Sequence, residues 1–214
     1  MSKLFSEEEL EQIKSAVKDA EKTTSAEIVP VFYESCGLYP DTYWKSGIFF
    51  AAAYSFCYLF YTKLTNTWGD SLSKFFVMQM TSGLIGVAAV YLIPAWKRLL
   101  TDKMFVKQRV RDVAYRVFLE ESVFNTKTRT GMLLFISFFE KEALILGDEG
   151  INQKVTPDVW EGILSQLIQG MKSGEKTNSI IAAIRSMGNL LKQYPIDAKD
   201  TNELRDDLRL GDTK

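Results

Sequence analysis

SGIFFAAAYSFCYLFYT (residues 46–62) and FFVMQMTSGLIGVAAVYLIPAW (residues 75–96) are two apolar stretches without a charged side chain. As helices rising 1.5 Å per residue they are about 25 and 33 Å long, close to the roughly 30 Å of a bilayer's hydrocarbon core. Lipid requires each segment to satisfy its own backbone hydrogen bonds, which a helix does. The short connection over residues 64–73 therefore predicts a transmembrane hairpin with both ends on one side of the membrane.

The residues around these stretches are typical of a membrane interface. Lysines close both stretches at Lys45, Lys63, Lys74 and Lys97. Tryptophans lie at one end (Trp44, Trp96) and in the connecting loop (Trp68). The alternative is a pair of buried helices in a soluble core, which usually keeps a polar stripe. Here the polar residues are few and uncharged, so we favour the membrane interpretation.

Basic residues indicate the orientation. Six of them follow the second stretch: Lys97, Arg98, Lys103, Lys107, Arg109 and Arg111. The connecting loop has only its bordering Lys63 and Lys74, so the positive-inside rule places both termini and the globular domain in the cytoplasm, at the inner membrane. The basic cluster is either attracted to anionic lipid or a solvated helix face.

Composition limits the possible functions. The net charge of −1 argues against nucleic-acid binding. The chain contains no histidine, which excludes Ser-His-Asp and Cys-His catalysis and His-ligated metal sites. Two cysteines, Cys36 and Cys57, suit a reducing compartment, and residues 1–34 lack the pattern of a cleavable signal.

Local patterns predict an α/β domain interrupted by the hairpin. Ser6 and Glu9 form a capping box at the start of a helix. Residues 27–34 are rich in β-formers, with Pro30 requiring an edge position or a bulge. After the hairpin we expect a helix over 103–122, strands over 132–138 and 143–146, and helices from Thr156 and over 177–193.

The fold class is therefore α/β, a small sheet sandwiched by helices and interrupted by a two-helix transmembrane hairpin. Residues 1–43 and 98–195 are expected to form the two parts of one cytosolic domain. Residues 44–97 form the hairpin, and residues 196–214 a charged C-terminal tail.

Several short stretches resemble one known family. They are TSAEIV (24–29), TRTGMLLFIS (128–137) with Glu140, ILGDEGI (145–151) and NEL (202–204). They resemble the TPM domain family, also called the TPM phosphatase family, in its bacterial membrane-hairpin branch. The resemblance implies an α/β/α sandwich and maintenance or modulation of a membrane complex, and for some soluble relatives weak acid-phosphatase activity or calcium binding. Members of this branch often carry a histidine shortly before Arg-Thr-Gly, where this chain has Asn125-Thr126-Lys127.

Four charged residues near strand ends form the candidate site: Glu27, Arg129, Asp148 and Glu149. Asp148 and Glu149 are candidate oxygen ligands for Ca²⁺ or Mg²⁺, and Arg129 is a candidate contact for a phosphate. In the alternative, the two acids decorate a glycine-bounded turn and Arg129 pairs with a carboxylate.

Three functions follow from these observations. The favoured one is an interaction or maintenance module for a membrane complex, with a membrane protein as partner. The alternative is a metal-assisted phosphatase acting on phosphomonoesters, although no activated nucleophile is evident in the sequence. A transporter or channel subunit is third, because two spans without an intramembrane charge offer no ion path unless they oligomerise.

Overall fold

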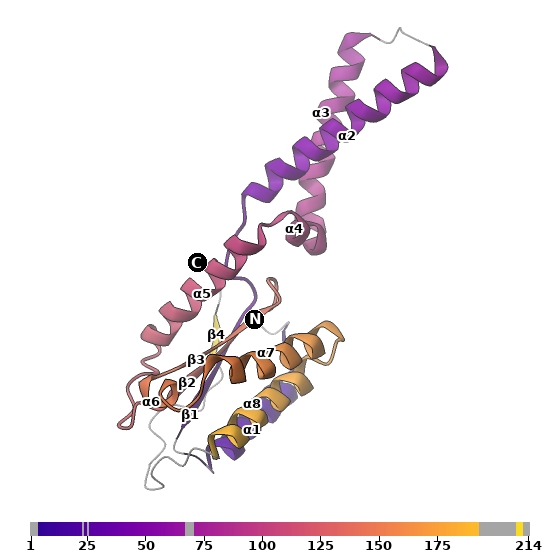
Figure 1. The fold of residues 1–214 in the computed structure, drawn as a ribbon. Helices are drawn as coiled ribbons and strands as arrows, with labels where there is room; N and C mark the ends of the chain where they lie inside the picture. Colours follow the sequence, from indigo (N-terminus) through magenta and orange to yellow (C-terminus); the bar gives the residue numbers. More distant parts are fainter. Residues whose placement is uncertain (1–3, 23, 25, 67–70, 193–208, 212–214) are drawn as a thin grey trace. The chain divides into compact units, whose positions relative to one another are not determined.

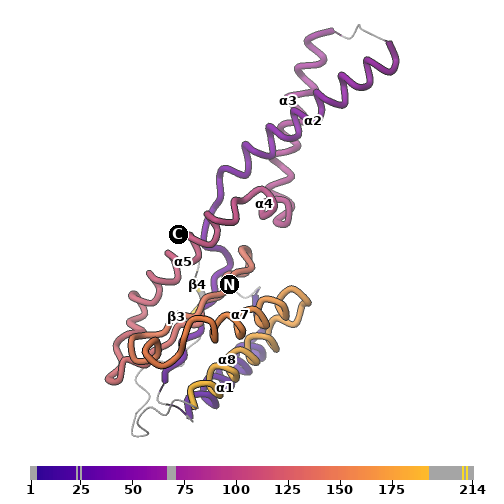
Figure 2. Tube along the Cα trace, in the orientation of Figure 1, coloured from indigo at the N-terminus to yellow at the C-terminus, as the bar shows by residue number. Residues whose placement is uncertain are grey.

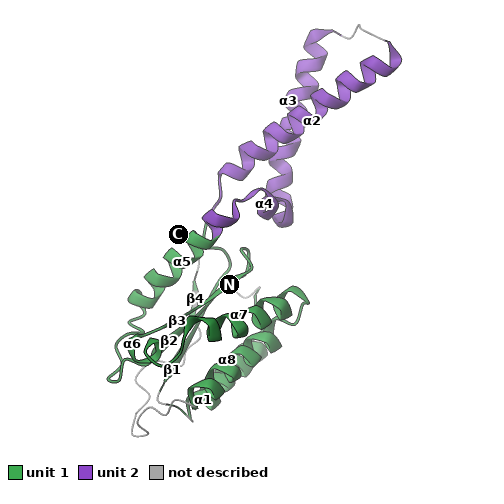
Figure 3. Cartoon of the chain, viewed as in Figure 1, with its two compact units in different colours: residues 1–37, 107–214 green, residues 38–106 purple. Residues whose placement is uncertain are grey.

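The computed structural model describes residues 4–22, 24, 26–66, 71–192 and 209–211. Trp68, Ser25, the stretch 202–204 and most of the predicted tail lie outside the described residues. The chain forms two compact units (Figure 3). Unit 1 comprises Met1–Gly37 and Lys107–Lys214, and unit 2 comprises Leu38–Val106. The divisions that we predicted after residues 43 and 97 therefore differ from the borders of the compact units by six and nine residues.

The sheet of unit 1 is built from chain segments on both sides of the apolar stretches. Its order is β3-β2-β1-β4. β1 (Glu27–Tyr33) runs parallel to β2 (Gly131–Ser137), which pairs antiparallel with β3 (Glu142–Gly147). β4 (Arg209–Gly211) lies in the segment predicted as a tail and pairs parallel with the second half of β1. The described residues of β4 pair with Val31–Tyr33, so Pro30 precedes that pairing, and on its other side it stands opposite Leu134 of β2.

Three helices cover one face of the sheet (Figure 1): α1 (Glu7–Glu21), α7 (Pro157–Lys172) and α8 (Lys176–Lys192). The apolar faces of these helices form a core with every second residue of the strands, namely Ile28, Phe32, Met132, Leu134 and Ile136. The predicted capping box is present, because Glu9 N–H donates to the Ser6 hydroxyl and Ser6 N–H to the Glu9 carboxylate. The expected helix starts and strand positions are confirmed to within a few residues.

The other face of the sheet carries the remaining strand residues, Val29, Val31, Leu133 and Phe135, which are also buried. α5 (Lys103–Glu120) lies on this side, opposite α1, α7 and α8 (Figure 1). Its buried side chains are Val106, Val110, Val113, Ala114 and Val117. Unit 1 is therefore an α/β domain with helices on both faces of a small mixed sheet.

Unit 2 consists of α2 (Asp41–Thr65), α3 (Leu72–Leu92) and the short α4 (Pro94–Leu100). Figure 2 traces the chain from β1 into α2 and from α4 into α5. α2 and α3 pack antiparallel, and small residues allow the close approach, since Gly83 lies against Gly47. Hydrogen bonds join the helices at three levels: Ser46 Oγ to Gly86 O (2.7 Å), Ser82 Oγ to Phe50 O (3.0 Å) and Gln79 Nε2 to Ser55 Oγ (2.9 Å).

The prediction of two membrane spans is only partly supported. Among the described helices, α3 is long and apolar enough to cross a membrane, and 11% of its most apolar stretch is buried. α2 does not meet this test: it contains Tyr54, Tyr58 and Tyr61 among its apolar residues and has Lys63 in its last turn. The structure therefore supports one candidate span by length and composition.

Candidate functional site

An ion pair joins Arg129 and Asp148, two of the four residues predicted for the site. Arg129 Nε lies 3.1 Å from Asp148 Oδ2, and the Asp148 side chain is 6% exposed against 50% for Arg129. Asp148 Oδ1 accepts a hydrogen bond from Glu149 N–H (2.8 Å), so Asp148 is also the N-cap of α6 (Glu149–Asn152). Both oxygens of this carboxylate therefore have partners within the domain.

The backbone of Arg129 is held in an unusual conformation. Its φ of 56° lies in the left-handed region, which costs a non-glycine residue free energy. Its N–H donates to Thr126 O (3.1 Å) and its carbonyl accepts from Gly150 N–H (2.9 Å). Gly150 allows this approach, because a Cβ there would lie 2.8 Å from Arg129 O. The turn before β2 and the turn after β3 thus fix the position of Arg129.

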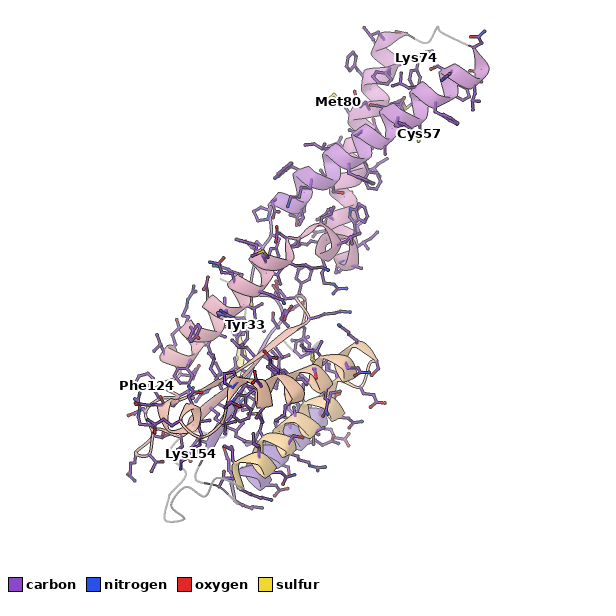
Figure 4. All side chains as sticks on the ribbon, viewed as in Figure 1. Tyr33, Cys57, Lys74, Met80, Phe124 and Lys154 are labelled. Carbon is purple, nitrogen blue, oxygen red and sulfur yellow. The ribbon has the colours of Figure 1, made fainter. Side chains whose placement is uncertain are left out.

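The guanidinium of Arg129 has two further contacts. Nη1 donates to Phe124 O (3.3 Å), and the group lies over the Phe124 ring, 5.8 Å from its centroid. Phe124 is labelled in Figure 4. The guanidinium is half-exposed, so some of its N–H groups can still donate hydrogen bonds toward solvent. A ligand for this group would therefore be an anion at the surface.

Glu27 and Glu149 are placed differently from this ion pair. Glu27 is the first residue of β1, opposite Gly131 in the parallel register, and its side chain is buried. Glu149 is exposed and accepts a hydrogen bond from Gln153 Nε2 (3.3 Å). All four predicted residues lie at the end of the sheet where β1 and β2 begin, whereas open α/β sheets bind ligands where parallel strands end.

The metal-ligand role of Asp148 and Glu149 stays a prediction. Within the part of the chain that the structure describes, no three Cys, Asp or Glu side chains group so as to hold a metal ion. Asp148 already neutralises an arginine and caps a helix. The ion pair matches the structural alternative, in which Arg129 pairs with a carboxylate. The two acids stand at the N-cap and the first residue of the short helix α6, whereas the alternative placed them in a turn.

A second polar cluster lies at the opposite end, where β1 and β2 finish. Its centre is Glu140, which is buried. Oε1 of Glu140 accepts from Cys36 N–H (2.8 Å) and from Ser35 Oγ (3.1 Å), and Oε2 accepts from Ser137 Oγ. Arg109 Nε donates to Cys36 O (3.1 Å). We call these five residues the Glu140 cluster.

The Glu140 cluster has a structural role. A hydroxyl beside a carboxylate has the composition of an activated nucleophile, but Ser137 is 0% exposed, so no substrate reaches it. Burial raises the pKa of the Cys36 thiol to about 12, and the negative charge of Glu140 adds to this effect. The thiol is therefore protonated and unreactive at neutral pH. The cluster fastens the end of β1 to the β2–β3 turn and to α5.

Sequence reasoning did not assemble this cluster. Ser35 and Cys36 lie 101 to 105 positions before their partners Ser137 and Glu140, and Cys36 looked like an ordinary loop cysteine. The only available signal was a glutamate directly after an apolar strand.

Two surface hollows of about 290 and 380 Å³ lie along α8 and the loop before it, and none of the residues of either site lines them.

The fold and the site define an α/β domain whose two parts flank an apolar helical pair. Residues 98–190 match the family model of the TPM domain, so the resemblance to that family is confirmed for this part of the chain. The membrane-hairpin branch stays a prediction. No curated protein matches the chain. Among solved structures, the chain is similar to the NMR structure of the BA42 protein from the psychrophilic bacterium Bizionia argentinensis. The two share 22% identity over 99% of this chain and 100% of that one, with a TM-score of 0.59, a likeness of fold alone.

Proposed function

We propose that this protein is a membrane-anchored TPM domain of the membrane-hairpin branch, whose unit 1 is an interaction or maintenance module for a membrane complex at the cytoplasmic face. The observation that carries the anchor is the distribution of exposed apolar side chains. Among the described residues, all but three of the exposed large apolar side chains belong to unit 2, and the exceptions are Tyr115, Leu119 and Val159. Such an apolar surface marks a membrane or protein interface.

The same pattern supports α2 as the second span. Its 25 residues extend about 38 Å, and Ile48, Phe56 and Leu59 are exposed on its outer surface. Its polar groups turn inward, because Ser46 and Ser55 are hydrogen-bonded to α3. A tyrosine-rich helix paired in this way leaves mainly apolar atoms facing lipid. Figure 4 shows the side chains that project around both helices.

The interaction role is supported by α5. Tyr115 and Leu119 are 53% and 63% exposed and stand four residues apart, so they share one face of this helix. Exposed apolar pairs of this kind are favoured contact points for a partner protein. Asp148 is already bound by Arg129 and by Glu149 N–H, and Ser137 is buried, so no specific observation among the described residues favours the phosphatase alternative.

Fractionation tests the anchor. The full-length chain expressed in bacterial cells should remain in the membrane fraction after extraction at pH 11 and should be released by detergent. A C-terminal fluorescent-protein fusion should be bright and an alkaline-phosphatase fusion inactive, as expected for a cytoplasmic terminus. Release by alkaline extraction would refute the anchor, and an active phosphatase fusion would refute the orientation alone.

Site-specific crosslinking tests the interaction role. A photoreactive amino acid at Tyr115 or Leu119 should give a discrete crosslinked product in native membranes. The same amino acid at Lys18, exposed on α1, serves as the matched control. Products of equal yield at all three positions, or at none, would contradict a binding surface on α5.

A further inference from the structure

We propose that α4, the first turn of α5 and Lys45 of α2 form a headgroup collar, a surface that binds acidic phospholipids and holds the anchor at a fixed depth. The collar consists of four basic residues, Lys45, Lys97, Arg98 and Lys103, and three apolar ones, Leu99, Met104 and Phe105. This inference rests on the proposed membrane anchor and specifies the lipid that it recognises.

The path of the chain places α4 beside the helix pair. α3 ends at Leu92, and the extended Ile93 and the N1 proline of α4 turn the chain sharply. α4 then folds back on the helix pair, because the Trp96 ring lies 5.6 Å from Phe49 and its Nε1 donates to Ser46 Oγ (2.8 Å). A segment held beside the end of a span stays at the level of the lipid headgroups, where an indole with a bonded N–H is commonly found.

The basic side chains of α2 and α4 lie close together. Lys97 Nζ lies 5.6 Å from the centre of the Tyr43 ring, and Lys45 Nζ lies 3.5 Å from Leu100 O, so the start of α2 and the end of α4 share a basic surface. Two acids are nearby in the sequence. Asp41 pairs with Lys45 (2.5 Å), and Asp102 accepts hydrogen bonds from Met104 N–H (2.7 Å) and Phe105 N–H (3.3 Å) as a cap of α5. The four cations therefore outnumber the acids by two.

Exposed apolar side chains lie next to these charges in the sequence. Leu99, Met104 and Phe105 are 73%, 82% and 55% exposed, although they are adjacent to these charged residues. Long basic side chains interleaved with bulky apolar ones are the composition of an interfacial segment, whose apolar groups enter the acyl boundary while the cations meet phosphate. An anionic membrane surface therefore fits the collar better than a protein of unspecified charge.

Lipid selectivity provides the first test. The full-length chain is reconstituted into bilayers of mixed phosphatidylcholine and phosphatidylglycerol, and the share of acidic lipid bound to the protein is compared with its share in the bilayer. We expect this enrichment ratio to be about three or more, since each basic residue near an anionic surface contributes about fivefold in affinity. The variant Lys97→Gln/Arg98→Gln/Lys103→Gln should lower this ratio toward one. The variant Lys14→Gln/Lys18→Gln/Lys22→Gln, which removes the same charge from α1, should leave it unchanged. An equal effect of both variants, or no enrichment in the wild type, would overturn the collar.

Depth provides the second test. In a Cys57→Ser background, a spin label at Leu99→Cys should show oxygen and nickel-complex accessibilities intermediate between water and hydrocarbon. A label at Leu84→Cys, on the exposed face of α3, should show those of the bilayer interior. Water-like values at position 99 with bilayer values at position 84 would refute the collar and keep the anchor, whereas water-like values at both would refute the anchor. Broadening at position 99 that grows with protein density would assign the surface to a second copy instead of lipid.

Discussion

Asp148 has two structural roles, because one of its oxygens caps α6 and the other pairs with Arg129. We predict that Asp148→Asn, which keeps the cap and loses the charge, lowers the free energy of unfolding by about 1 kcal/mol. Asp148→Ala loses both and should cost about 2 kcal/mol. Glu149→Gln, at an exposed position, should stay within about 0.5 kcal/mol. Chemical denaturation of the full-length chain in detergent, followed by circular dichroism, measures these differences.

The same variants separate the two interpretations of the site. If the ion pair is structural, any hydrolysis of a generic phosphomonoester with Mg²⁺ or Ca²⁺ should follow only the folded fraction. A loss of about a hundredfold or more in Asp148→Asn or Arg129→Ala with folding intact would instead assign these residues to catalysis.

Cys36 gives a pH dependence whose sign follows from its environment. Burial and Glu140 raise the pKa of its thiol from 9.0 to about 12, so the unfolded chain releases this proton first as the pH rises. Its contribution to stability is therefore complete below pH 9 and decreases from there toward pH 12. We predict that Cys36→Ala, although less stable at pH 8, loses less stability than the wild type between pH 8 and pH 10.5. Parallel slopes for the two proteins in denaturation across this range would contradict the raised pKa.

Sequence reasoning found Arg129 and Asp148 because a charged residue beside a strand end that is marked by glycine is a local signal. It missed the Glu140 cluster because no local pattern shows that Cys36 and Glu140 meet. Their contact depends on the parallel pairing of β1 with β2, which brings together residues more than a hundred positions apart.

Among the helices and strands, the start of β2 is the place where a substitution is least tolerated. A Cβ on Gly131 would lie 1.8 Å from Val123 O, so any side chain must displace backbone. We predict that Gly131→Ala lowers the free energy of unfolding by about 3 kcal/mol or more. Gly162 in the exposed part of α7 has open space around it, and Gly162→Ala should raise stability by about 0.5–1 kcal/mol. Hydrogen exchange of β2 amides and denaturation midpoints measure both, and similar effects of the two substitutions would contradict the close packing at Gly131.

The elements that the sequence predicted are those with a local cause. The capping box of Ser6 and Glu9 and the uninterrupted apolar run of β2 specify their own structure. β4 has only three residues and lies in a charged segment. It is a strand because it pairs with the edge of β1, so no local sequence pattern predicted it. The expectation that α2 also spans a membrane had a local signal of intermediate strength, because tyrosines are typical both of interfaces and of buried packing.

For the whole molecule, the decisive property is that one sheet is shared by segments before and after unit 2. Arg109 Nε lies 3.1 Å from Cys36 O, so within unit 1 the points where the chain leaves and returns are close, on the order of 10 Å apart. About three or four extended residues cover that distance at 3.3–3.6 Å each. Unit 2 is therefore an insertion whose removal leaves the sheet, α1, α7 and α8 complete and shortens α5 by its first turn, Lys103–Val106.

We predict that replacing residues 38–106 by a flexible linker of about eight Gly and Ser residues gives a protein that is soluble without detergent. This variant loses nearly all the exposed large apolar side chains of the described chain, while the core around β1 and β2 keeps its residues. Amide exchange should show protected β1 and β2 amides, and alkaline extraction should leave none of the variant with membranes.

Adding Glu140→Ala to this variant should destabilise it by about 2–4 kcal/mol, because Cys36 N–H and the Ser137 hydroxyl lose a charged acceptor. Aggregation of the linker variant with unprotected strands would show that unit 2 contributes to the folding of the α/β domain as well as to its anchoring.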